Sequence, residues 1–373
     1  MTAQKAKIAE NATLVESSAE QKTVAAARRR VLKWWDRNRR EFPWRAIRGR
    51  APDPYFVWLS EIMLQQTNVT TAAPYFGRFT RRWPSVESLA QASLEEVVDE
   101  FAGLGYYSRA RNLHACAQAV AAGGGAFPRE VAELRALPGV GDYTAKAVAA
   151  IAFGRPCVPV DANIRRILYR YFGIKRLDRE GEKRLLDLSG SWADRNRPGD
   201  LAQALMDLGA MVCRPREADC RSCPLGADCV AARSDPTLFP AAAKKAVRKI
   251  RFGVAFYAQD RRGNFLVRRR PAKGLLAGTL ELPGAIGIDE PTQAAALKWR
   301  PFAGKWEKMP ECVEHVFTHF TLKLTVYRGL FERLPEVDGG CSAMPCGPQS
   351  LDKLSSAMAK AARYAHAGPK IML

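Results

Sequence analysis

The sequence has no long apolar run, no internal repeat and no recognisable secretion signal. A membrane-spanning helix needs about 20 consecutive apolar residues, so any contact of this chain with a membrane would be peripheral. The absence of repeats argues against a solenoid. Residues 1–24 are small and polar, without an apolar core or a clear cleavage site, and we expect them to form a disordered N-terminus.

Acidic residues are also scarce beside the basic ones. The 373 residues include 38 Asp and Glu against 58 Lys and Arg, which gives a formal net charge of +20. A surface this basic attracts polyanions, of which nucleic acid is the commonest, with an anionic membrane face as the alternative. The chain is long enough for two or three domains with sizeable apolar cores, and we expect a monomer.

Hydrophobic periodicity divides the chain into a helical part and a mixed part. Residues 25–212 are predicted to form an all-α domain, because apolar residues recur at spacings of three and four over 86–101, 108–121, 142–153 and 163–172. Residues 231–249 are small and basic and have the composition of a linker. Residues 250–373 are predicted to form an α+β domain, with strands over 252–258, 264–268 and 322–330, and helices after Glu290 and over 350–363.

Four of the nine cysteines are clustered within residues 213–230. Their spacing is C-x6-C-x2-C-x5-C, and the four are Cys213, Cys220, Cys223 and Cys229. Four thiolates in one short loop can each bind a corner iron of a [4Fe–4S] cluster. A structural zinc site is the alternative, but zinc ribbons usually have two separated C-x2-C pairs and this loop has one. Clustered thiols without a disulfide framework also suggest a reducing compartment, most simply a bacterial cytoplasm.

This cysteine spacing at the end of a helical domain resembles the endonuclease III and MutY superfamily of DNA glycosylases. The sequence Leu-Pro-Gly-Val-Gly at 137–141, which includes Gly139 and Gly141, precedes an Ala-rich helix that we expect to begin near Asp142. Backbone N–H groups at such a turn can hold a phosphate oxygen. The turn resembles the helix-hairpin-helix of the same superfamily.

Asp161 follows the hairpin and precedes a predicted helix, where we expect it to be the N-cap. A carboxylate at a helix N-terminus is stabilised in its ionised form, which suits a group that faces a cationic sugar. The resemblance implies this role for Asp161, with Asn163 beside it. In relatives of the endonuclease III type, the hairpin position of Tyr143 carries a lysine that attacks the sugar. A phenol cannot form a Schiff base, so the resemblance implies a monofunctional enzyme.

Glu61 lies among apolar residues of a predicted helix. A single Glu in a helix is usually solvated, but burial among apolar neighbours would raise its pKa and keep it protonated. A neutral and an ionised carboxyl group together suit glycosidic cleavage through an oxocarbenium-like state. Residues 60–67 (SEIMLQQT) resemble the adenine-pocket helix of the MutY family, which implies that Glu61 protonates adenine N7. Trp44 and Arg45 also match that family.

The resemblance implies further contacts with DNA. Gln66 and Tyr106 would enter the duplex beside the estranged guanine, and Leu104 belongs to the same tight turn as Tyr106. Gln203 matches a position that faces the extruded adenine, although a solvated helical glutamine explains its spacing equally well. Tyr107, next to Tyr106, is expected to be an apolar anchor of the turn.

The last 120 or so residues resemble the Nudix-like domain of MutY proteins, mainly through LLAG at 275–278 and LELPG at 280–284. Gly284 and Glu290 fit the start of a Nudix box, but residues 298–302 (KWRPF) replace its metal-binding glutamates, so we do not expect pyrophosphate hydrolysis. The loop with Phe317, Thr318 and His319 resembles the Phe-Ser-His loop that inspects 8-oxoguanine, with threonine in place of serine.

The resemblance as a whole implies a monofunctional adenine DNA glycosylase that acts on duplex DNA with adenine opposite 8-oxoguanine or guanine. One alternative is an endonuclease III-like glycosylase and lyase for oxidised pyrimidines. Another is a catalytically silent DNA-binding protein with an iron–sulfur cluster.

Overall fold

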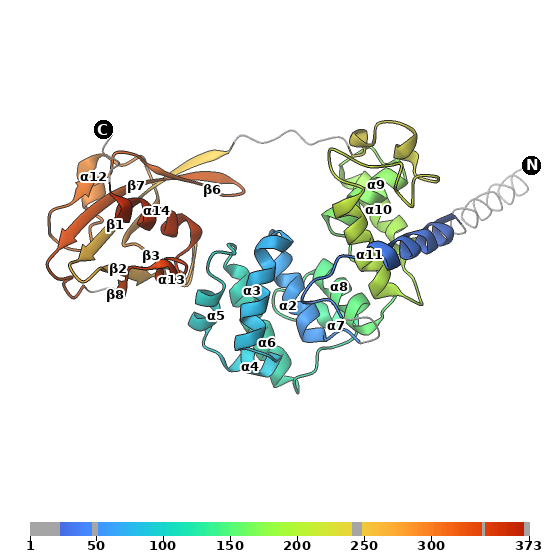
Figure 1. Ribbon diagram of the computed structural model, residues 1–373, viewed down its shortest axis with the longest axis horizontal. Helices are drawn as coiled ribbons and strands as arrows, with labels where there is room; N and C mark the ends of the chain where they lie inside the picture. The colour runs from blue at the N-terminus through green and yellow to red at the C-terminus, as the bar shows by residue number, and fades with distance from the viewer. Residues whose placement is uncertain (1–22, 47–50, 241–247, 338–339, 369–373) are drawn as a thin grey trace, which may run out of the picture. The chain divides into compact units, whose positions relative to one another are not determined.

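The computed structural model describes residues 23–46, 51–240, 248–337 and 340–368 (Figure 1). The chain forms two compact units. The first contains the chain up to Thr80 together with 116–244, and the second contains 81–115 together with 245–373. The predicted disordered N-terminus lies outside the described residues, except that Thr23 and Val24 begin a helix over 23–38.

The first unit is helical, as the periodicity predicts, and no β-strand occurs among the described residues from 51 to 212. After the helix over 23–38 come α2 (Pro54–Leu64), α3 (Val69–Arg82), the end of α6 (Ser108–Ala122), α7 (Val131–Arg135), α8 (Asp142–Phe153), α9 (Ala162–Tyr171), α10 (Arg179–Ser189), η1 (Gly190–Trp192), α11 (Pro198–Met211), η2 (Val230–Arg233) and η3 (Pro236–Leu238). Helix α8 packs against both α2 and α11, and α11 also packs against α9. The hairpin, the Glu61 helix and the Asp161 helix therefore meet around one core.

The second unit is built on a sheet of eight described strands. They are β1 (Lys249–Asp260), β2 (Asn264–Arg269), β3 (Leu280–Glu281), β4 (Gly284–Ile288), β5 (Glu307–Lys308), β6 (Val313–Val316), β7 (Phe320–Phe331) and β8 (Cys341–Pro345). The main path runs β3-β2-β1-β7-β5, and β1 and β7 are parallel over their whole length, from Lys249 opposite Phe320 to Asp260 opposite Phe331.

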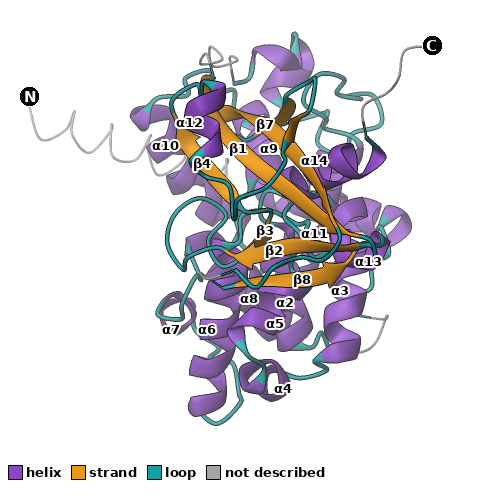
Figure 2. Cartoon of the chain, turned by 90° about the vertical axis from the view of Figure 1, so that its left-hand side faces the viewer, coloured by secondary structure: helices purple, strands orange, loops and turns teal. Residues whose placement is uncertain are grey.

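Both faces of this sheet are covered. Alternate residues of β1 belong to different clusters: Ala255 and Tyr257 pack with α14 (Ser356–Ala367), and Val254 and Phe256 pack with α12 (Gln293–Leu297). This two-residue alternation is what a strand between two layers requires. Figure 2 shows β1 and β7 side by side with α14 against them. The three predicted strands and the helix after Glu290 are confirmed.

Two predicted helices are each divided in two. The stretch 86–101 forms α4 (Val86–Gln91) and α5 (Leu94–Glu100), because Ser93 makes a capping box with Glu96 and starts a new helix. The stretch 350–363 forms α13 (Pro348–Leu351) and α14, because Leu354 is buried and bridges to Leu280. Periodicity alone gives no sign of these breaks.

Residues 81–115 belong by their contacts to the second unit, whereas the predicted boundaries place them in the helical domain. Arg269 donates two hydrogen bonds to the Asp99 carboxylate, at 2.9 and 3.0 Å, and Arg111 donates to the Ala277 carbonyl at 2.9 Å. In the predicted linker, residues 231–240 pack on the first unit, with Ala231 and Phe239 buried. Residues 241–247 lie outside the described ranges. No helix in the described part of the chain is long and apolar enough to cross a bilayer.

Candidate active site

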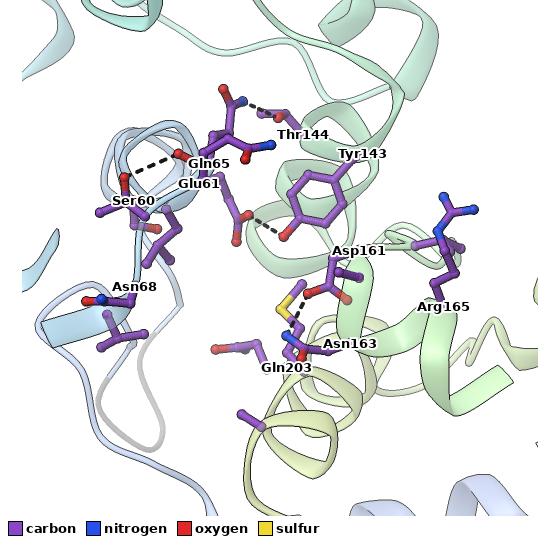
Figure 3. Close-up of a pocket in the computed structure, with 18 of the residues that line it drawn as sticks. Ser60, Glu61, Gln65, Asn68, Tyr143, Thr144, Asp161, Asn163, Arg165 and Gln203 are labelled. Atoms are coloured by element: carbon purple, nitrogen blue, oxygen red, sulfur yellow. Dashed lines mark hydrogen bonds between the residues drawn. The ribbon is translucent and has the colours of Figure 1, made fainter. Parts of the chain in front are cut away.

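One pocket in the first unit collects most of the predicted site residues (Figure 3). Its volume of about 1540 Å³ exceeds that of an ordinary small-molecule site, so it can receive a nucleotide still attached to a strand. The predicted residues that line it are Trp44, Arg45, Glu61, Gln66, Gly139, Gly141, Tyr143, Asp161, Asn163 and Gln203. They come from α2 and the segments on either side of it, the hairpin, α8, the start of α9 and α11.

Glu61 is held on α2, whose N-terminus is fixed by Asp53 as N-cap and Pro54 in the first turn. The Glu61 side chain is buried, with the residue only 6% exposed. The pKa of Glu61 is raised from 4.5 to about 7, mainly by burial and to a smaller extent by the charge of Asp161. The hydrogen bond from Tyr143 and the charge of Arg45 act in the opposite direction and lower the pKa. The predicted rise is confirmed, and near neutral pH a large fraction of Glu61 carries a proton.

Tyr143 is hydrogen-bonded to Glu61 and lies within the electrostatic influence of Asp161. Its hydroxyl donates to Glu61 Oε2 at 2.7 Å, and burial together with the nearby charges of Glu61 and Asp161 raises its pKa well above the ordinary value. The phenol therefore stays protonated and remains a donor. Figure 3 shows Glu61, Tyr143 and Asp161 pointing into the same pocket.

Asp161 is the N-cap of α9, as predicted, and accepts hydrogen bonds from the Ile164 amide at 2.7 Å and from Asn163 Nδ2 at 3.0 Å. Its pKa nevertheless differs from the expectation that a helix N-terminus favours the ionised form. Burial raises the pKa of Asp161, against the hydrogen bonds from Ile164 and Asn163 and the charge of Arg166. Desolvation at this depth outweighs the helix end.

Asp207 is a residue that sequence reasoning missed. It lies on α11 one turn after Gln203, and its carboxylate is fully buried. It accepts two bonds from the Arg45 guanidinium, at 2.7 and 2.9 Å, and two from Arg40, at 2.8 Å from Nε and 3.2 Å from the backbone amide. Trp35 Nε1 donates a further bond at 3.0 Å. Burial alone would raise the pKa of Asp207, but the Arg45 and Arg40 guanidinium groups outweigh it and lower the pKa. Asp207 therefore fixes two pocket arginines as an ionised partner.

A chain of hydrogen bonds leads from Asp161 to the cysteine loop. Asn163 donates to Asp161, Arg166 Nη2 donates to Asn163 Oδ1 at 3.0 Å, and Arg166 Nε donates to the Cys213 carbonyl at 2.8 Å. Helix α11 comes close here because it has Gly209, where a Cβ would lie 2.6 Å from Asn163 Cβ. The loop and the pocket are thus joined by a continuous series of hydrogen bonds.

The four clustered cysteines line one small cavity in the first unit. Burial raises the pKa of Cys223 to about 12, and the pKa values of Cys220 and Cys229 are also raised by burial and by the neighbouring thiols. Arg170 Nη1 donates to Cys213 Sγ at 3.3 Å. Among the described residues no three His, Cys, Asp or Glu side chains are grouped to hold a single metal ion. Four thiols around one cavity fit a group that binds each sulfur separately.

The remaining predicted residues lie in the second unit. Leu104 is buried and Tyr106 is exposed in the turn after α5, and Tyr107 is buried as the expected anchor. The Tyr106 hydroxyl is hydrogen-bonded to Thr318 Oγ1.

The Phe-Thr-His loop itself is partly open to solvent. Thr318 and His319 are exposed at its tip. Phe317 stacks on the buried Phe320 with ring centroids 4.6 Å apart. The stacked Phe317 ring fixes the base of the loop, and the exposed side chains of Thr318 and His319 can contact another molecule.

Comparison with known proteins identifies the family. A family model described as HhH-GPD superfamily base excision DNA repair protein matches residues 59–189, and a NUDIX domain model matches residues 254–363. The adenine DNA glycosylase of Buchnera aphidicola subsp. Schizaphis graminum is 31% identical over 306 residues, which cover 79% of this chain and 84% of that protein. The chain belongs to the adenine DNA glycosylase family.

Other relatives agree with this family. The adenine DNA glycosylase of Arabidopsis thaliana is 36% identical over 302 residues, which cover 71% of this chain and 48% of that protein. The adenine DNA glycosylase of Rattus norvegicus is 43% identical over 217 residues, which cover 55% of this chain and 42% of that protein. The chain therefore spans about half the length, or less, of these two relatives. A solved structure of a thermostable thymine-DNA glycosylase is 30% identical, with a TM-score of 0.51, and covers 58% of this chain and 99% of its own. The predicted all-α glycosylase fold followed by a Nudix-like fold is confirmed.

Proposed function

We propose that this chain is a monofunctional adenine DNA glycosylase of base excision repair, which removes adenine opposite 8-oxoguanine or guanine in duplex DNA. The observation that carries the proposal is the pair of carboxyl groups in one pocket with room for a nucleotide, with the pKa of Glu61 raised to about 7. Membership of the adenine DNA glycosylase family supplies the substrate.

The chemistry assigned to the pocket has two parts. A flipped adenine enters, and neutral Glu61 delivers a proton to the base, which makes the base a better leaving group. As the N-glycosidic bond breaks, the Asp161 carboxylate stabilises the positive charge that develops on the sugar. Asn163 and the Ile164 amide fix the orientation of Asp161. Water then adds to the cationic sugar carbon and loses a proton, which forms the hydroxyl of an abasic site. Tyr143 offers no amine to attack the sugar instead, so the strand is left uncut.

We also propose that Cys213, Cys220, Cys223 and Cys229 bind a [4Fe–4S] cluster. When bound, the cluster would supply a cross-link that closes the loop over residues 213–229. Arg170 would hold this loop from outside, since it also donates to the carbonyls of Arg214, at 2.8 Å, and Pro215, at 2.9 Å.

The partner is duplex DNA, which the net charge of +20 favours. The hairpin glycines Gly139 and Gly141 would approach a phosphate. Gln66 and Tyr106 would enter the base stack, and Gln203 would face the adenine. Trp44 and Arg45 would complete the pocket wall.

The second unit would read the opposite base. The polar tips of Thr318 and His319, with Phe317 behind them, would contact the 8-oxoguanine. The division into an HhH domain (25–212), a cluster loop (213–230), a linker (231–249) and a lesion-reading domain (250–373) stays our proposal, as does a monomer in a bacterial cytoplasm.

A single-turnover assay on four duplexes tests the function. They carry A opposite 8-oxoguanine, A opposite G, T opposite G, and thymine glycol opposite A. Release of adenine from the first two only, with strand cleavage appearing only after alkali, is the expected result. Release of thymine glycol with spontaneous strand cleavage would instead establish the endonuclease III-like activity. No release from any duplex despite binding would establish the silent DNA-binding protein.

A further inference from the structure

The turn that carries Tyr106 has an unusual backbone. Gly103, Gly105 and Tyr106 all have positive φ, at 94°, 73° and 51°. The two glycines adopt this conformation without steric cost, but a tyrosine in the left-handed region is disfavoured. The Tyr106 side chain is also 45% exposed, so packing of its own ring does not account for the conformation. Other contacts must hold it.

Arg109 makes the contacts that oppose this cost. Its Nη2 donates to the Leu104 carbonyl at 2.9 Å and to the Gly105 carbonyl at 3.0 Å, the two carbonyls just before Tyr106. Its guanidinium also lies over two aromatic rings, 5.0 Å from the centroid of Phe101 and 5.8 Å from that of Tyr106. One planar group therefore touches the backbone before Tyr106, the Tyr106 ring, and the core beneath the turn.

Burial of the Arg109 side chain costs free energy, because a charged group loses its hydration. Arg109 is only 6% exposed, and burial lowers its pKa to about 10, so it remains charged at neutral pH inside the protein. A second brace already closes the base of the turn, because the Gly103 amide donates to the buried Tyr107 hydroxyl at 3.1 Å. Folding of the turn thus has support without Arg109. The Tyr106 ring itself is held from two sides, by the Arg109 guanidinium and by the hydrogen bond between its hydroxyl and Thr318 Oγ1, and Arg109 alone also holds the two carbonyls before it.

We propose that Arg109 is a positioning residue, whose guanidinium clamps the turn so that the Tyr106 ring is presented ready to insert into a base stack. The inference rests on the proposed function, in which Tyr106 enters the duplex. A ring that inserts between bases has to hold one orientation. If Arg109 fixes that orientation before DNA binds, binding does not have to supply the entropy cost of ordering the Tyr106 side chain. Lysine cannot replace Arg109, because a point charge cannot bridge two carbonyls and stack on a ring at once.

A double-mutant cycle tests this coupling. Single-turnover excision of A opposite 8-oxoguanine is measured for the wild-type protein, Tyr106→Ala, Arg109→Lys and the double variant. If Arg109 acts through Tyr106, Arg109→Lys slows the reaction about tenfold when Tyr106 is present and less than twofold when it is absent. Equal losses in both backgrounds would overturn the proposal, as would an unchanged rate in Arg109→Lys.

Two controls separate positioning from stability and from the proposed function. Arg111→Lys changes a nearby arginine that binds the Ala277 carbonyl rather than the turn, and it should leave the rate unchanged. If Arg109→Lys lowers the midpoint of thermal unfolding, Arg109→Gln, which keeps a planar donor, takes its place in the cycle. The fluorescence of 2-aminopurine placed beside the mismatch reports unstacking without excision. Wild-type unstacking that Arg109→Lys weakens only when Tyr106 is present would uphold the clamp even if adenine release failed.

Discussion

Replacing Glu61 by glutamine should stabilise the folded protein at neutral and alkaline pH. In the wild type, burial raises the pKa of Glu61 from 4.5 in the unfolded chain to about 7 in the folded one. Between these two pH values the folded state keeps a proton that the unfolded state releases. The free energy of unfolding therefore falls as pH rises through this window. Glutamine has no proton to lose, and its amide oxygen can still accept from Tyr143.

The size of the effect follows from the pKa change. Each pKa unit corresponds to about 1.4 kcal/mol, so a rise from 4.5 to about 7 gives about 3 kcal/mol. The advantage of Glu61→Gln over the wild type should be smallest near pH 4.5, grow up to pH 7 and then level off. About 3 kcal/mol is a large part of the total unfolding free energy of a typical domain. The ionisable Glu61 therefore lowers the stability of the folded protein at pH 7 and above, as residues of functional sites often do.

Urea unfolding at half-unit steps from pH 4.5 to 8.5 measures this difference directly. Glu133→Gln is the matched control, because it makes the same chemical change at a residue that is exposed on α7 and does not line the pocket. An advantage of Glu61→Gln that stays constant across the range, or a variant less stable than wild type at pH 8, would refute the assignment of Glu61 as a neutral buried acid.

Further predictions concern catalysis, packing and the cysteine loop. The single-turnover excision rate should fall about tenfold per unit above pH 7 as Glu61 loses its proton, and a flat rate to pH 9 would count against Glu61 as the acid. Tyr143→Phe removes a hydrogen bond that lowers the pKa of Glu61, so the falling limb should move to higher pH; movement to lower pH would contradict this. Asp207→Asn should lower the free energy of unfolding by about 3 kcal/mol, since it leaves the largely buried Arg45 without an ionised partner, whereas Asp228→Asn, at a partly exposed pair, should cost about 1 kcal/mol or less. Cys223→Ser should reduce the iron content and speed proteolysis of the loop; full iron content in the purified variant would show that the ligand set is wrong.

Local features of the site were accessible from the sequence. The cap position of Asp161 follows from its place before an amphipathic helix, and the burial of Glu61 follows from its apolar neighbours. Each depends on residues within a turn or two. The family resemblance supplied the roles, which spacing alone leaves open.

Features that depend on distant segments were not accessible. Asp207 binds Arg45, which is 162 positions away, so no local pattern marks it as the centre of a buried cluster. The pKa of Asp161 was expected in the wrong direction because a helix end is visible in a sequence but the depth of burial is not. The break between α13 and α14 coincides with a bridge from Leu354 to Leu280 of β3, which is 74 positions earlier in the chain.

The hydrogen bond between Tyr143 and Glu61 also decides which oxygen of the carboxyl group bears hydrogen. Because the phenol stays protonated, it donates to Glu61 Oε2, and since the carbonyl oxygen of a neutral carboxyl group is the better acceptor, the acidic hydrogen is favoured on Oε1. Proton transfer then has a defined starting atom and direction. A side chain of the same length whose two oxygens were interchangeable would offer its hydrogen to the base only part of the time.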